Sequence, residues 1–440
     1  MKVKTLSRKA EDFTRERPTD LQPVTRSSKP SLHPFEKARE YARAVNAVKL
    51  DKHFSKPFVG NLEGHCDGVW SMAKCAGQLN ELMTGGCDGE LIQWRLSQRE
   101  AAWRVRAHRG FCRGITYVPD GQAVLSCGDD KVVKLWTPRE SQAARATYLS
   151  THTLTDIDMH WDGELFATAG TELQIWDVSR AKPTNSYTWG SGSFTRVRFN
   201  PVERSVLLGL SSDRGITLHD LRAGSSLRKV TMQTRANACA WNPMEAFNFV
   251  LASEDHNLYT FDMRKPERAL LVHEDHVGPV LDVDFSPTGT EFASGSYDRS
   301  IRVWASQGQR STTVYHTRRM HRIFCVKVSV DAKFVLSGSD DTNVRIWKAK
   351  ANAKLGALIP REETKAQYSE ALVERHKHLP EVRRIVRKQH VPKSILKAKR
   401  AKDHMKKAAQ RKDDNRRKHS KPGSMPKPSV REARIWKVEQ

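Results

Sequence analysis

The sequence lacks the features that mark several common classes of protein. It contains no run of about 18 apolar residues, the length of a membrane-spanning helix, so we expect no membrane partner. Its 7 cysteines are scattered and include no Cys-x-x-Cys pair, which argues against a disulfide framework and a thiolate metal site. No phosphate-binding loop, zinc-protease or serine-hydrolase motif stands at a strand-to-helix junction. The sequence therefore predicts no enzyme, no cofactor and no metal, in a cytosolic or nuclear setting.

Positive charge, by contrast, is abundant and unevenly placed. The chain has 75 Lys and Arg against 50 Asp and Glu, a net charge of +25. Residues 1–60 carry +7 and residues 351–440 carry +16, whereas the long middle region carries only +2. This segregation indicates that the two ends contact a polyanionic partner.

A repeat of about 42 residues runs through the middle region. Short strand-like runs end on a key residue, and these key residues are spaced 42, 40, 43, 42, 43 and 43 positions apart. They are Trp94, Trp136, Trp176, His219, Phe261, Trp304 and Trp347. An aspartate stands six residues before the key residue in six of the seven repeats, and Gly170 takes its place in the third.

These repeats resemble the WD-repeat family over residues 57–348. The resemblance implies an all-β, seven-bladed propeller, with an N-terminal extension at 1–56 and a basic α-helical C-terminal domain at 349–440. It also implies a buried chain of hydrogen bonds within a blade, and we assign its residues a structural role rather than a catalytic or metal-binding one. The expected chains are His65, Thr84, Asp88 and Trp94; His108, Ser126, Asp130 and Trp136; His276, Ser294, Asp298 and Trp304; and His321, Ser337, Asp341 and Trp347.

The two ends of the repeat region predict how the propeller closes. The repeat stops directly after Trp347, which leaves the last blade without its outer strand, and residues 58–62 are the natural donor. Before them, residues 34–48 predict an amphipathic helix that turns Phe35, Tyr41, Val45 and Val48 toward a partner. We expect the first 30 residues to be disordered until bound.

The C-terminal region predicts three helices, at 363–378, at 381–389 after Pro380, and from 395 to about 419 after Pro392. The third has too few apolar residues for a buried face, so we expect most of it to be solvated. A basic helix without aromatic residues predicts contact with RNA phosphates rather than base stacking, and a nuclear import signal is the alternative. The candidate RNA-binding residues are Arg383, Arg384, Arg387, Lys388, Lys393, Lys397, Lys399, Arg400, Lys402, Lys406, Lys407, Arg411, Lys412, Arg416, Arg417 and Lys418.

Both ends resemble the suppressor-of-fibrillarin WD-repeat family. The resemblance is carried by PFEKAREYARAVNAVKLDKHFSKPFVGNLEGH, YSEALVERHKHLPEVRRIVRKQHVPKSI and RKDDNRRKHSKPG, and it spans nearly the whole chain. It implies a non-catalytic nucleolar factor of the small-subunit processome. The partners that it implies are precursor ribosomal RNA, small nucleolar RNA of the box C/D particle and other processome proteins.

Two neighbouring repeats carry a motif that points to another function. They end in HDLR (219–222) and FDMR (261–264), which resemble the WDxR pattern by which some propellers dock on the adaptor of cullin-RING ubiquitin ligases. Asp220 and Asp262 would order the turns while Arg222 and Arg264 reach the adaptor. Local pairing of the arginines is the simpler interpretation, so a role as a ubiquitin-ligase substrate receptor remains the alternative.

Overall fold

The computed structural model describes residues 29–139, 141–190, 192–421, 423–427 and 429–439. The expectation of disorder in the first 30 residues concerns residues that lie almost wholly outside these ranges. The chain forms two compact units, one containing residues 29–48 and 359–383 and the other containing residues 49–358 together with the chain from 384 onward. Among the described residues, no helix combines the length and the apolar character that crossing a membrane requires.

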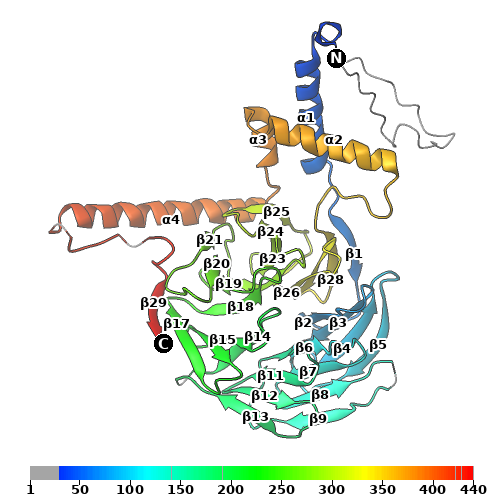
Figure 1. The fold of residues 1–440 in the computed structure, drawn as a ribbon, viewed down its shortest axis with the longest axis vertical. Helices are drawn as coiled ribbons and strands as arrows, with labels where there is room; N and C mark the ends of the chain where they lie inside the picture. Colours follow the sequence, from blue (N-terminus) through cyan, green and yellow to red (C-terminus); the bar gives the residue numbers. More distant parts are fainter. Residues whose placement is uncertain (1–28, 140, 191, 422, 428, 440) are drawn as a thin grey trace, which may run out of the picture. The chain divides into compact units, whose positions relative to one another are not determined.

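The larger unit is a seven-bladed β-propeller, as the sequence predicts (Figure 1). Each blade is an antiparallel sheet whose strands follow one another in the chain. The first three blades consist of β2 (Val69–Lys74), β3 (Glu81–Gly86), β4 (Glu90–Arg95) and β5 (Glu100–Arg106); β6 (Cys112–Tyr117), β7 (Val124–Gly128), β8 (Val132–Trp136) and β9 (Ala146–Leu149); and β10 (Asp156–Met159), β11 (Leu165–Ala169), β12 (Leu173–Asp177) and β13 (Pro183–Tyr187). The next three consist of β14 (Phe194–Phe199), β15 (Val206–Ser211), β16 (Gly215–Asp220) and β17 (Ser226–Met232); β18 (Ala236–Trp241), β19 (Asn248–Ser253), β20 (Leu258–Asp262) and β21 (Leu271–His273); and β22 (Val280–Phe285), β23 (Glu291–Ser296), β24 (Ile301–Ala305) and β25 (Ser311–Tyr315).

The seventh blade joins the two ends of the repeat region. It contains β26 (Ile323–Val328), β27 (Phe334–Ser339) and β28 (Val344–Lys348), and its outer strand is β1 (Phe58–Leu62). Phe58 lies opposite Trp347 and Leu62 lies opposite Val344. The predicted strand donor is therefore confirmed, and this pairing leaves no open edge on β28.

Carboxylates on the innermost strands join neighbouring blades. Asp284 on β22 accepts a hydrogen bond from the backbone N–H of Val328 at 2.9 Å and one from the Lys74 ammonium at 3.0 Å. Asp156 on β10 likewise accepts from the N–H of Val197 at 3.1 Å and from Arg198 at 2.6 Å. Buried charges are stable only when they are paired in this way, so these contacts fix the blades against one another.

Two of the four expected side-chain chains are fully hydrogen-bonded. In the second blade His108 contacts Asp130 at 3.0 Å and Ser126 at 2.8 Å, and the Trp136 indole donates to Ser126 at 2.9 Å. The sixth blade repeats the pattern. His276 contacts Asp298 at 2.9 Å and Ser294 at 2.7 Å, and the Trp304 indole donates to the same serine at 2.8 Å.

The seventh blade corrects the sequence-based assignment. Trp347 donates to Ser337 at 3.0 Å as expected, but His321 is exposed and the neighbouring Met320 is buried instead. Asp341 pairs with the guanidinium of Arg345, four residues later. An arginine beside the carboxylate provides both the charge and the hydrogen bonds that a histidine would supply.

The first blade has only part of its chain. His65 and the Trp94 indole both contact Thr84, at 2.7 and 2.8 Å, but Asp88 is not hydrogen-bonded to His65. Its carboxylate instead accepts from the backbone N–H of Glu90 at 3.1 Å. The expected His65–Asp88 link is therefore wrong, and the Nδ1 of His65 is left without a hydrogen-bond partner among the described residues.

His219, the key residue of the fourth blade, is buried with both ring nitrogens hydrogen-bonded. It contacts Thr217 and Ser226, each at 2.9 Å. Burial lowers the pKa of His219 to about 4. Since the ordinary value is about 6.5, the unfolded chain binds this proton between pH 6.5 and 4 while the folded chain does not. The free energy of unfolding therefore falls as the pH falls through this window.

Replacing His219 with Phe should make the propeller less sensitive to acid. Between pH 7 and 4 the buried His219 lowers the free energy of unfolding of the wild type by about 3 kcal/mol. Phenylalanine binds no proton, so the variant should not show this part of the loss. Urea unfolding at several pH values measures this difference. His152→Phe, at an exposed position, is the control and should keep the wild-type pH dependence. A His219→Phe slope equal to that of the wild type would contradict the assignment.

The C-terminal segment adds a strand that the sequence analysis did not predict. Strand β29 (Ile435–Glu439) pairs antiparallel with β17 and makes the fourth blade five-stranded (Figure 1). Val438 lies opposite Val230 and both are on the inner side of the pair. The segment before it also bonds the fifth blade, where the Arg434 guanidinium lies 3.7 Å from Asp255.

The smaller unit is helical and joins both extensions of the chain. It contains the short helix η2 (Pro30–Leu32), most of α1 (Glu36–Lys52), all of α2 (Pro360–His376) and the start of α3 (Pro380–Val386). Tyr41 donates to Glu381 at 2.6 Å and Arg375 pairs with Glu40 at 3.2 Å. The partner of the N-terminal helix is thus this chain's own C-terminal region. Phe35 is 68% exposed, so the expectation that it faces a partner stays a prediction.

Candidate nucleic-acid interface

Helix α4 (Lys393–Lys418) carries most of the candidate RNA-binding residues. It starts directly after Pro392, and lysine, alanine and arginine, all strong helix formers, dominate its sequence. Three basic residues occupy its last turn, where they interact favourably with the carbonyl end of the helix. With about 1.5 Å of rise per residue, the helix is about 39 Å long.

One face of α4 is docked on the propeller, and we call it the docking face (Ile395, Lys399, Lys402 and Lys406). The ammonium of Lys399 lies 2.6 Å from Asp275 and that of Lys406 lies 2.6 Å from Glu274, while Lys402 donates to the carbonyl of His276 at 3.3 Å. Ile395 is buried. These contacts fix the N-terminal half of the helix beside the fifth and sixth blades (Figure 1).

The ionised Asp275 carboxylate provides the negative charge that Lys399 needs on the docking face. Burial would raise the pKa of Asp275, but the hydrogen bond and charge of Lys399 and the N–H of Ser311 hold it below its usual range. Burial also lowers the pKa of Lys402. Lys399, Lys402 and Lys406 therefore bind the propeller, and their assignment as RNA-binding residues stays a prediction.

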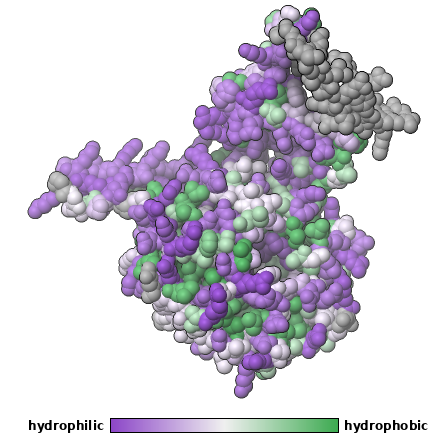
Figure 2. Space-filling view, in the orientation of Figure 1, coloured by the Kyte–Doolittle hydropathy of each residue, from purple (hydrophilic) through white to green (hydrophobic). Residues whose placement is uncertain are grey.

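The opposite face of α4 carries a row of exposed basic side chains. A helical period of 3.6 residues aligns positions three and four apart, and it places this row about half a turn from the docking face. We call it the outer stripe, and its members are Lys393, Lys397, Arg400, Lys407, Arg411 and Lys418. Within the described residues the structure shows no ion pair for any of them. Figure 2 shows that the helix surface is hydrophilic along its length.

The remaining candidates lie outside the stripe. Arg416 and Arg417 pair with Asp413 and Asp414 within the helix, at 3.8 and 2.9 Å, which reduces their availability to a phosphate. The others are exposed, and they are Arg383, Arg384, Arg387, Lys388 and Lys412. The expectation of a mostly solvated helix is confirmed, because Ile395 is the one buried residue among those of α4 that the structure describes.

The two adaptor-like motifs end strands β16 and β20. Asp220 accepts from the backbone N–H of Arg222 at 2.9 Å, and Asp262 accepts from that of Arg264 at the same distance. The arginines differ, however. Arg264 binds its aspartate through two nitrogens and lies 4.1 Å from the Phe247 ring centroid. Arg222 donates to the Ser205 hydroxyl at 2.7 Å, and its side chain is 78% exposed against 60% for Arg264, so it is the more accessible of the two.

Comparison with known proteins agrees with this division of the chain. The description "WD domain, G-beta repeat" matches residues 56–95, 100–137, 267–305 and 312–348, and "Sof1-like domain" matches residues 349–435. The chain is 42% identical to Protein SOF1 of Saccharomyces cerevisiae, an alignment that covers 99% of this chain and 94% of the yeast protein. The chain belongs to the Sof1-like family of WD-repeat proteins.

Vertebrate relatives of this Sof1-like chain have another name. The chain is 47% identical to a Danio rerio protein and 46% identical to a Homo sapiens protein, over 100% of both chains in each case. Both are named DDB1- and CUL4-associated factor 13. The vertebrate name corresponds to the alternative function that the sequence analysis left open.

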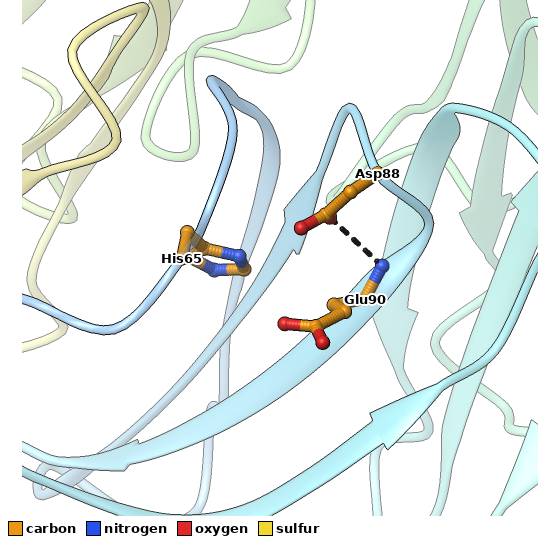
Figure 3. A group of neighbouring side chains, drawn as sticks. All are labelled: His65, Asp88 and Glu90. Carbon is orange, nitrogen blue, oxygen red and sulfur yellow. Dashed lines mark hydrogen bonds between the residues drawn. The ribbon is translucent and has the colours of Figure 1, made fainter.

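The first blade of the Sof1-like propeller contains a group of side chains that could hold a cation. Atoms of His65, Asp88 and Glu90 lie within 4.8 Å of one another, and this is the one such group among the residues that the structure describes. Figure 3 shows the His65 ring facing the two acidic side chains. Arg104 lies 3.7 Å from Glu90 and already supplies a positive charge. Burial lowers the pKa of His65 to about 4; the Arg104 charge also lowers this pKa, and the Asp88 carboxylate opposes both. The Nδ1 of His65 and one carboxylate oxygen of Glu90 are buried without a hydrogen-bond partner among the described residues, and the Arg104 charge beside them disfavours a second cation.

Sequence reasoning missed the acidic residues that dock α4 in this Sof1-like chain. Glu274 and Asp275 stand in a loop more than 120 residues before the lysines that they bind. The i, i+3, i+7 spacing of Lys399, Lys402 and Lys406 was a local signal for a shared face. The partner of that face could be found only from the folded propeller.

Proposed function

We propose that this protein is a non-catalytic scaffold in the assembly of the small ribosomal subunit, acting in the nucleolus. The outer stripe of α4 lies along the phosphates of precursor ribosomal RNA, while the propeller binds other processome proteins. The observation that carries this proposal is the division of α4 into a docked face and an exposed basic face. A row of side chains of one charge, held on a fixed helix, is suited to a regular polyanion.

The geometry favours backbone contact over sequence recognition. Arginine and lysine bind phosphate oxygens without reference to the base, and the stripe has no aromatic residue on which a base could stack. Docking also reduces the ordering that binding requires, because half of the helix is already fixed to the propeller. The resemblance to the suppressor-of-fibrillarin family favours precursor ribosomal RNA and its guide small nucleolar RNA as the polyanion.

The test is the replacement of the six outer-stripe residues with Gln in the full-length chain. The variant should lose precursor RNA in a purified binding assay and keep a folded propeller. Deleting residues 380–440 is a poorer test, because it would uncover the binding sites of both α4 and β29 on the propeller. Undiminished RNA binding by the Gln variant would sink the proposal.

A second candidate function rests on the exposure of Arg222 and on the name of the vertebrate relatives. We infer that, if this chain binds DDB1, Arg222 makes the decisive contact, because its side chain is 78% exposed whereas that of Arg264 is 60% exposed and holds its aspartate through two nitrogens. Arg222→Ala should then weaken binding of purified DDB1 by at least tenfold, whereas Arg264→Ala should have a smaller effect. Surface plasmon resonance measures both.

The matched control is Arg180→Ala. Arg180 lies near the end of the corresponding strand of the third blade, also beside an aspartate, with 68% of its side chain exposed. It should bind DDB1 like the wild type. If the wild-type chain shows no DDB1 binding, or if Arg222→Ala binds normally, this second function is excluded.

A further inference from the structure

Three aromatic rings gather where the innermost strands of the seventh, first and second blades begin. Trp70 on β2 lies 5.1 Å from Phe324 on β26 and 5.9 Å from Phe111, just before β6. Strands β26, β2 and β6 are neighbours around the centre of the propeller (Figure 1). Phe111 is 36% exposed, and Trp70 and Phe324 are half-buried. The rings therefore present a shared aromatic surface to solvent.

An arginine of the chain already uses one side of this surface. The guanidinium of Arg113 lies 4.9 Å from the Trp70 ring centroid and 4.6 Å from that of Phe111. The same guanidinium is paired with Asp129 through two nitrogens, at 2.8 and 3.1 Å. The Arg113 guanidinium thus stacks on two aromatic rings and pairs with a carboxylate where the first and second blades meet.

The seventh blade has the same arrangement without the cation. Phe324 is the second residue of its innermost strand, as Arg113 is in the second blade, and Asp340 precedes the repeat aspartate as Asp129 does. A Cβ added to Gly68 would meet Phe324 at 3.3 Å and the Asp340 carboxylate at 3.4 Å, which places ring and carboxylate side by side. The structure shows no ion pair for Asp340 within its described residues. A carboxylate beside exposed rings therefore lacks the positive partner that its counterpart has.

Asp67 adds a second carboxylate to the same place. It is exposed, it directly precedes Gly68, and one of its oxygens accepts the Gly68 N–H at 2.7 Å. The pKa of the nearby Cys87 thiol shows that negative charge dominates around these carboxylates. Burial and the carboxylates of Asp67, Asp340 and Asp88, opposed by Arg113, raise the pKa of the Cys87 thiol to about 12. In a chain with a net charge of +25, this is a locally negative surface.

We propose that this aromatic–acidic patch (Asp67, Trp70, Phe111, Phe324 and Asp340) binds an arginine-rich segment of a partner protein. A guanidinium stacks on the Trp70 and Phe324 rings and pairs with Asp340, as Arg113 does with Asp129 on the neighbouring blade. Arginine suits the site better than lysine because its planar group both stacks on rings and forms paired hydrogen bonds with carboxylates. RNA is disfavoured, since Asp67 and Asp340 would repel its phosphates.

The test uses the full-length protein and three probes. They are an acetylated and amidated peptide of six Arg-Gly repeats, its Glu-Gly counterpart and a uridine 12-mer. Calorimetry should detect binding of the Arg-Gly peptide, and the Glu-Gly peptide should not bind. Trp70→Leu should weaken the Arg-Gly complex by about tenfold. The double variant Asp67→Asn, Asp340→Asn should do the same without altering the aromatic packing.

Trp161→Leu is the matched control, because Trp161 is also exposed and also carries an arginine, Arg204, at 3.9 Å. It should bind the Arg-Gly peptide like the wild type. Equal affinity of the patch variants and the wild type would overturn the proposal. So would a loss of uridine 12-mer binding in Trp70→Leu with unchanged peptide binding, which would make the patch an RNA-stacking surface. The Gln variant of the outer stripe should keep peptide binding, so this proposal and the RNA proposal can fail separately.

Discussion

The affinity of the full-length chain for a fragment of small-subunit precursor RNA should fall by about 10³-fold when the salt concentration is raised from 50 to 200 mM. Each phosphate that a basic side chain neutralises releases bound counterions, and added salt opposes that release. The outer stripe offers six exposed basic residues, and about six phosphate contacts give a fall of this size. Fluorescence anisotropy across a salt series measures the slope.

The Gln variant of the outer stripe should bind more weakly at 50 mM salt and show a much flatter slope. A control with the same change of charge replaces six exposed basic residues of the propeller with Gln: Lys182, Lys265, Arg268, Arg310, Arg318 and Arg319. This control should keep the wild-type slope. If both variants flatten the slope equally, the RNA responds to the net charge of the chain and α4 has no special part.

Asp298→Ala should destabilise the propeller by about 3–5 kcal/mol. The Asp298 side chain is 4% exposed, and it accepts from His276 at 2.9 Å, from the N–H of Val277 at 3.2 Å and from the Ser300 hydroxyl at 2.6 Å. Burial would raise the pKa of Asp298, but the charge and hydrogen bond of His276 and the hydrogen bond of Ser300 hold it well below its usual range. Alanine would leave these buried donors without a partner. Urea unfolding followed by tryptophan fluorescence gives the loss.

Asp88→Ala is the informative comparison, because Asp88 occupies the same position in the first repeat. Its carboxylate accepts from the backbone of Glu90 and not from His65, so the loss should be about 1 kcal/mol. The repeat pattern alone would assign both aspartates the same importance. Equal losses in the two variants would show that the difference between these blades has no energetic consequence.

The fold could be predicted because its signals are local and repeated. The key residues Trp94 to Trp347 mark one strand per blade, and the missing strand after Trp347 predicts closure by residues 58–62. His321 was misassigned because its fit to the spacing concealed a local competitor. Arg345 on strand β28 lies four residues after Asp341, and its guanidinium pairs with the Asp341 carboxylate that His321 was expected to bind.

Contacts of the C-terminal region with the propeller could not be predicted. Lys399 is 124 residues from Asp275, and no sequence feature of either segment predicts that the two are in contact. The alternation in β29 is only five residues long, and it pairs with a strand about 200 residues earlier. The basic composition of α4 indicated a polyanionic partner, but the division between docking face and outer stripe depends on the position of the propeller acids.

The most direct test of the scaffold proposal is in-cell crosslinking of the full-length protein, followed by sequencing of the attached RNA and mass spectrometry of the attached peptides. We predict RNA reads concentrated on small-subunit precursor RNA and its guide small nucleolar RNA, and crosslinked peptides from residues 393–418. The Gln variant of the outer stripe should lose those reads. Reads at background level for the wild type would contradict the account and leave the basic ends as import signals, with DDB1 binding as the remaining function.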